Sequence, residues 1–205
     1  MVERLIAAVR RPQPAGGIAL WLMLAAPPVR TAAEADMSLH MLVQIPLLMV
    51  AGWLLAGALR PPAWFRLADE GGWAGTLVAV LAASYWMVPR VLDAALVDLR
   101  FEFLKFVGLP LLVGAPLRWS WPRLSALGRG FVITNMLSMT AFVGWLYVAA
   151  PVRVCVYYMA EQQVMAGKLL LAATAAAGLL FFLRCLVGPA ERISATRVST
   201  NLGET

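Results

Sequence analysis

The residues best suited to chemistry are grouped around the only histidine of the chain, His40. Met37 and Met41 flank this histidine, and Asp36 lies four residues before it. In a helix, residues four apart share a face, so Asp36 is expected to stack with His40, and Met37 with Met41. Imidazole and thioether groups together suit copper better than magnesium or calcium. The spacing therefore predicts a soft-metal site where an apolar segment begins.

The composition predicts a membrane protein. Hydrophobic residues make up 61% of the 205 residues and charged residues 14%, and the mean hydropathy is +0.77, which is too apolar for an ordinary soluble domain. The formal net charge of +6 does not indicate nucleic-acid binding, because the arginines flank apolar segments and form no dense basic run.

The apolar segments predict an all-α polytopic bundle in a single domain, because roughly 20 apolar residues are needed to span a bilayer as a helix. The fourth segment contains Glu102 and Lys105 and two prolines, so we expect it to be kinked, shallow or re-entrant. A polar cytoplasmic tail is expected over 188–205. Six spans are expected, near 15–29, 37–59, 73–89, 101–117, 131–151 and 164–187.

The distribution of arginine predicts the orientation of the bundle. Most arginines fall in the termini and in the loops of one side, whereas the other side has Arg30, Arg90, Arg100 and Arg153. The positive-inside rule then makes both termini cytoplasmic in a multi-pass protein of the bacterial inner membrane. His40 is thereby expected at the outer, periplasmic end of the second span.

The N-terminal segment has a second interpretation. Basic residues before residues 16–26 are typical of a signal peptide, and Ala33-Glu34-Ala35 would be its cleavage site. Cleavage would leave five spans and make Asp36 the first residue. Retention of the segment is the interpretation we adopt, and His40 faces outward in either case.

Further soft ligands are expected on the outer side. Cys155 and Met159 lie in the connection before the last span, and Gln44 lies one turn deeper than His40. Cu(I) favours thioether, thiolate and imidazole ligands. We therefore expect copper at Met37, His40 and Met41, with Cys155, Met159 or an outer carboxylate completing the site. The alternative is a hydrogen-bonded interfacial histidine among methionines that only fill space.

Charged residues near the membrane boundary form a second group. Glu102 and Lys105 are three residues apart, as are Arg90 and Asp93, so each pair can form an ion pair on one helical face. Such pairs lower the cost of placing charge near hydrocarbon. They are expected to hold the third and fourth spans together, or else to support the metal site or an ion path.

The stretch Ser38-Leu39-His40-Met41-Leu42-Val43-Gln44-Ile45-Pro46-Leu47-Leu48 resembles the histidine-bearing segment of the CtaG-type membrane proteins linked to cytochrome c oxidase copper assembly. The resemblance covers roughly one helix. It implies a copper-handling role in the assembly of a haem–copper oxidase, with Met37, His40 and Met41 as ligands. Gln44 stands where the family pattern would have a second histidine.

A non-enzymatic function is expected, because the sequence has no phosphate loop, zinc-protease motif, nucleophile elbow or dinucleotide fingerprint. The expected partners are the lipid bilayer and an oxidase subunit, or a second copy packed through the small residues of 172–178. One alternative is an accessory or structural subunit of a respiratory complex. Another is a small transporter using Glu102 and Lys105, for which no inverted repeat or paired broken helices were found.

Overall fold

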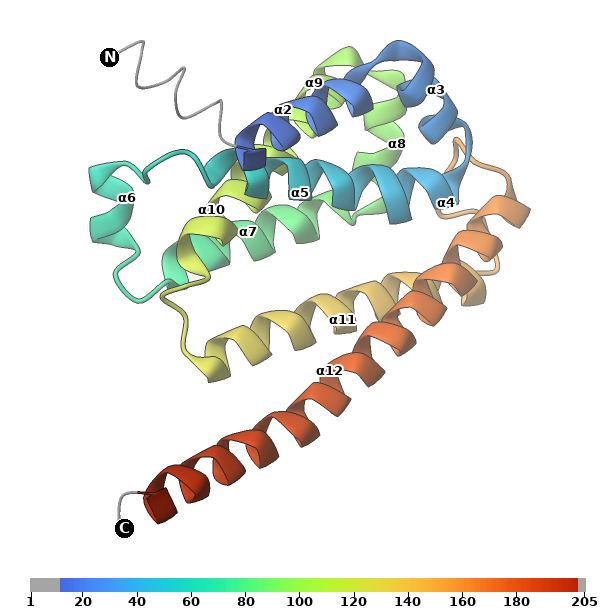
Figure 1. Ribbon diagram of the computed structural model, residues 1–205. Helices are drawn as coiled ribbons and strands as arrows, with labels where there is room; N and C mark the ends of the chain where they lie inside the picture. Colours follow the sequence, from blue (N-terminus) through green and yellow to red (C-terminus); the bar gives the residue numbers. More distant parts are fainter. Residues whose placement is uncertain (1–11, 203–205) are drawn as a thin grey trace.

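The described part of the chain consists of helices and the connections between them, and it contains no strand (Figure 1). The computed structural model describes the backbone of residues 12–202 and the side chains of residues 13–186. The basic residues of the possible signal peptide, and the side chains of the predicted tail over 188–205, lie outside these described residues. The predicted all-α class is confirmed.

Within the described residues, three helices are long and apolar enough to cross a membrane. The first runs from Met37 to Ala56 through α4 (Met37–Leu39), η1 (His40–Gln44) and α5 (Ile45–Ala56). The second is α11 (Ala126–Ala149), and the third is the segment Ala160–Leu186 of α12 (Ala160–Leu202). These helices coincide with the spans predicted near 37–59, 131–151 and 164–187.

The count of six spans is not confirmed, since three helices, or four at most, meet the length and composition of a span. Helix α2 (Pro12–Ala25) has only 14 residues. Helices α7 (Trp73–Trp86) and α8 (Pro89–Val97) are bent by 71°, and together they give the possible fourth span. The segment of α9 (Leu99–Gly108), η2 (Leu109–Gly114) and α10 (Ala115–Ser120) contains several charged side chains.

Two segments have the same order of helices: repeat one covers residues 12–56, and repeat two covers residues 73–120. Helix α2 is followed by α3 (Pro27–Ala35), and α7 by α8; α3 and α8 each have nine residues and begin with proline. Asp36 and Asp98 then cap the next helix, each accepting a hydrogen bond from a backbone N–H. Residues 27–36 and 89–98 share the pattern P-x-V-x-x-A-A-x-x-D, and Ile-Pro-Leu-Leu at 45–48 matches Leu-Pro-Leu-Leu at 109–112.

The second helices of the two repeats are packed against each other at glycines. A Cβ atom on Gly52 would overlap the backbone of Pro110, and one on Gly114 would overlap the backbone of Met49. Each helix also contains a π-helical segment beside a proline, at Pro46 and Pro110. Small residues permit such close approach of backbones.

Pro110 has a further local effect. It has no N–H, so the carbonyl of Phe106, four residues earlier, loses the donor that a regular helix would supply. The indole Nε1 of Trp21, on α2, donates to this carbonyl at 2.8 Å. This hydrogen bond joins α2, the first helix of repeat one, to α9, which runs into the π-helical segment η2 of repeat two.

One end of the molecule gathers the short helices α3 and α8 and the connection of residues 150–159, and we call it the α3 end (Figure 1). Val156 N donates to the Asp93 carboxylate of α8 at 2.8 Å, and the Tyr158 hydroxyl donates to the backbone carbonyl of Glu34 in α3 at 2.9 Å. Helix α6 (Ala63–Ala68) lies at the opposite end. The predicted site residues lie mostly at the α3 end.

Candidate polar centre at the α3 end

His40 is fully buried at the first residue of the π-helical segment η1. Neither ring nitrogen has a hydrogen-bond partner, although buried polar groups are normally paired. Met37 and Met41, on either side in sequence, are also buried and belong to one core cluster with Leu48 and Tyr147. The Tyr158 ring lies 6.4 Å from the imidazole, centroid to centroid. The arrangement is an unsatisfied imidazole in a largely apolar, thioether-containing environment.

Of the two ligands predicted in the connection before α12, the structure brings one into this core. Cys155 is 1% exposed and belongs to the same cluster as Met37 and Met41. Its thiol donates to the Tyr147 hydroxyl at 3.7 Å, and burial raises the pKa of Cys155 to about 11. Met159 is 70% exposed and is not part of the cluster.

Within the described residues, no group of three or more histidine, cysteine, aspartate or glutamate side chains is placed to hold a metal ion. Both cysteines are free. Met37 and Met41 carry thioethers, which are further ligand types for a soft metal.

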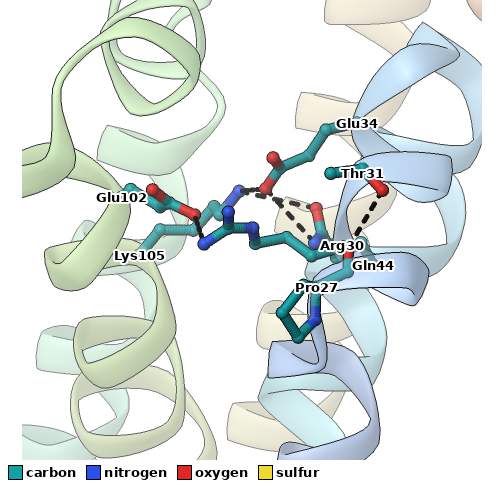
Figure 2. A network of polar contacts seen from close by, with 7 residues as sticks. All are labelled: Pro27, Arg30, Thr31, Glu34, Gln44, Glu102 and Lys105. Atoms are coloured by element: carbon teal, nitrogen blue, oxygen red, sulfur yellow. Dashed lines mark hydrogen bonds and ion pairs between the residues drawn. The ribbon is translucent and has the colours of Figure 1, made fainter.

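Four charged side chains form a network between α3 and α9, which Gln44 of η1 joins (Figure 2). Arg30 Nη1 contacts Glu102 Oε1 at 2.5 Å, and Lys105 Nζ contacts Glu34 Oε1 at 2.6 Å. Gln44 joins the second pair: its Nε2 donates to Glu34 at 3.4 Å, and its Oε1 accepts from Lys105 at 3.5 Å. The Lys105 side chain is fully buried. The two pairs balance in charge, which lowers the cost of burial.

Both ion pairs connect the two repeats. Helix α3 of repeat one supplies Arg30 and Glu34, and α9 of repeat two supplies Glu102 and Lys105. The Tyr158 hydroxyl adds a bond to the Glu34 backbone, and burial raises the pKa of Tyr158, so this hydroxyl stays a neutral donor. The network therefore fastens α3 to its surroundings.

The predicted pairings within the third and fourth spans are wrong. Glu102 and Lys105 each pair with α3 rather than with each other, because α3 lies across α9 and offers both signs of charge. Arg90 is exposed and forms no ion pair within the described residues, and Asp93 instead accepts from the backbone of Val156.

The predicted stacking of Asp36 on His40 is also wrong. Asp36 precedes the helix, with extended backbone angles of φ −121° and ψ 127°. Its side chain accepts from Leu39 N at 3.0 Å and caps the helix. Gln44, predicted one turn below His40, is buried as expected, but its partners are Glu34 and Lys105.

Sequence reasoning missed Arg30, Glu34, Tyr147 and Tyr158. Arg30 was used only for orientation, and Glu34 only as part of a possible cleavage site. A sequence signal was available, because the repeated P-x-V-x-x-A-A-x-x-D pattern places Arg30 and Glu34 four residues apart on a short helix. That spacing predicts a helix able to present both charges to one neighbour.

Comparison with protein-family models, with curated proteins and with solved structures finds no match for this chain. The chemistry of the site therefore has to be argued from its own residues. Imidazole and thioether groups are ligand types that suit a soft cation. The neighbouring network of paired charges can hold two repeats together, or separate when one pair breaks.

Proposed function

We propose that this protein handles Cu(I) at the α3 end of a membrane bundle, with His40, Met37 and Met41 as the binding groups. The observation that carries the proposal is the fully buried His40 imidazole, whose two nitrogens have no protein partner. A bound cation would satisfy one of them. The cation is cargo, and a role in assembling a haem–copper oxidase rests on the resemblance of residues 38–48 to the CtaG-type proteins.

The ligand chemistry selects a soft monovalent ion over harder divalent ions. Thioethers and imidazole favour Cu(I), while magnesium, calcium and manganese favour carboxylate and carbonyl oxygens. Cys155 is within the same core cluster, but its raised pKa keeps it a protonated thiol near neutral pH. It would become a ligand only if metal binding released its thiol proton to solvent. Metal transfer benefits from such an incomplete ligand set, since release requires an open position.

Titration with Cu(I) under reducing conditions tests the proposal. We expect His40→Ala, and the double variant Met37→Leu with Met41→Leu, to weaken binding at least about tenfold, or about 1.4 kcal/mol. Met159→Leu is the matched control, because Met159 is exposed and lies outside the cluster. Equal affinity of the wild-type, His40→Ala and Met159→Leu proteins would reject the ligand assignment.

A second candidate, a small transporter, is favoured by the repeat. Many transporters are built from internal repeats with interrupted helices that meet near the substrate site. Here the repeats run in the same direction, and their interrupted helices cross at Gly52 and Gly114. Uptake of Cu(I) into sealed vesicles containing the purified protein distinguishes transport from binding alone.

The role of accessory subunit in a respiratory complex stays a prediction. Purification in mild detergent tests it: a stoichiometric complex that persists in the His40→Ala variant would favour the structural role over copper handling. Loss of the complex in that variant would instead tie the association to the His40 centre.

A further inference from the structure

Helix α3 covers the polar centre but is not anchored by apolar packing. It contacts α4 and η1, the segments that carry Met37 and His40. None of its nine residues is buried. Its counterpart in repeat two, α8, has the same length and also begins with proline, yet Leu92 and Ala95 of α8 are 2% and 1% exposed. Burial of such side chains is the main force that fixes a helix in place.

Both short helices are bounded by extended residues at which the chain can turn. Ala26 (ψ 130°) and Asp36 (ψ 127°) flank α3, and Val88 (ψ 123°) and Asp98 (ψ 120°) flank α8. The hinges are thus common to both repeats, and only the anchoring differs. Rotation about a few residues at the ends of an element is the usual way in which a lid opens.

The attachments that hold α3 down are polar. They are the Arg30–Glu102 and Glu34–Lys105 ion pairs, the bond from Tyr158 to Glu34 O, and a bond from Gln162 Nε2 to Ala35 O at 3.5 Å. The Arg30 and Glu34 side chains are 35% and 15% exposed. The partly exposed Arg30–Glu102 pair exchanges for water at low net cost. The Glu34–Lys105 pair is the stronger part of the attachment, because Lys105 is fully buried.

A cavity of about 390 Å³ lies beside the first hinge. It is lined by Ala25 and Arg30 together with Trp21, Phe103 and Phe106. Arg30 of α3 therefore borders unfilled space on this side of the helix.

We propose that α3 is a lid over the His40 centre, hinged at Ala26 and Asp36 and latched by the two ion pairs. Opening the lid separates Glu34 from Lys105 and Gln44 and uncovers the buried imidazole at the α3 end. Helix α8 is the fixed counterpart in the same molecule. The use of the lid for metal entry rests on the proposed function, whereas its movement does not.

Hydrogen–deuterium exchange of the full chain in lipid nanodiscs tests the lid, without metal. We expect backbone amides of α3 to be protected at least about tenfold less than those of α8, because opening free energies follow local burial. Arg30→Gln should raise exchange in α3 and leave α8 unchanged. Leu92→Ala, the matched variant, should raise exchange in α8 only.

Equal protection of α3 and α8 in the wild-type protein would overturn the lid, and so would an Arg30→Gln variant that leaves exchange in α3 unchanged. The wild-type comparison needs no substitution, so misfolding of a variant does not remove the test. Fast exchange in α3 with no Cu(I) binding would retain the lid and reject the proposed function. Loss of Cu(I) binding in the His40→Ala variant, together with slow exchange in α3, would support the proposed function and reject the lid.

Discussion

At the scale of single residues, the molecule tolerates groups that are costly to bury. His40 has no hydrogen-bond partner, whereas the fully buried Lys105 has a carboxylate at 2.6 Å. A neutral imidazole can remain unpaired at moderate cost, but an unpaired ammonium cannot. Lys105 is thus paired within the protein, whereas both nitrogens of the His40 imidazole are unpaired.

Cys155 gives a test of its own at this scale. Because burial raises its pKa to about 11, the thiolate is scarce at neutral pH, and alkylation by iodoacetamide should be slow. We expect the rate to rise about tenfold per pH unit up to about pH 11. Mass spectrometry of the modified peptide measures the rate, with Cys155→Ala to separate it from Cys185. Rapid alkylation at pH 7 would contradict the buried, protonated thiol.

At the scale of helices, proline and glycine determine how the two repeats meet. Pro46 and Pro110 interrupt regular hydrogen bonding in two apolar helices, and π-helical segments lie beside both. Gly52 and Gly114 then bring these helices into backbone contact. The two helices thus have irregular hydrogen bonding near the point where they cross. The close contact at Gly52 and Gly114 restricts how far their backbones can move relative to each other.

Substitution of glycine tests the crossing. Gly52→Ala should destabilise the protein by about 1–3 kcal/mol, because its Cβ would overlap the Pro110 backbone, which cannot move aside cheaply. Gly130→Ala is the control, since no heavy atom lies within 4 Å of the Cβ it would add. Unfolding by denaturing detergent measures both. Similar stabilities for the two variants would show that the helices do not cross as described.

The positions of the long apolar helices could be predicted from the sequence, but the contacts between side chains of distant helices could not. The spans near 37–59, 131–151 and 164–187 were predictable, since long uncharged apolar runs form helices regardless of their neighbours. The break at Ala26 and the bend before α8 were not, because apolar composition alone does not record where a helix turns. Met37 and Met41 share one core cluster, as their helical spacing predicts. The charge partners of Glu102 and Lys105 did not follow from local spacing, because they come from α3, about 70 residues away.

At the scale of the whole molecule, two repeats and an appended hairpin of α11 and α12 make up the described chain (Figure 1). Within the segment Ala160–Leu186 of α12, only 6% of the most hydrophobic window is buried, so the described part of this helix leaves most of its surface uncovered. The polar centre, in contrast, lies where the repeats and the 150–159 connection meet.

The orientation predicted from arginine can be tested by sided labelling. In a variant lacking Cys155 and Cys185, a cysteine at Val156 should react with a membrane-impermeant maleimide added outside intact cells. A cysteine at Leu67 in α6 should react only after permeabilisation. Both positions are well exposed, at 77% and 82%. The opposite labelling pattern would reverse the orientation and place the polar centre on the cytoplasmic side.

The pairing of Lys105 with Glu34 also affects how the chain can fold during synthesis. Glu34 precedes Lys105 by 71 residues, so it is translated first, and the ammonium finds its counter-charge in a segment already made. The charge of Lys105 in α9 can therefore be paired with Glu34 before the later helices are synthesised. A truncated chain that begins after repeat one would translate Lys105 with no Glu34 to receive it, and insertion of α9 into the membrane should be impaired.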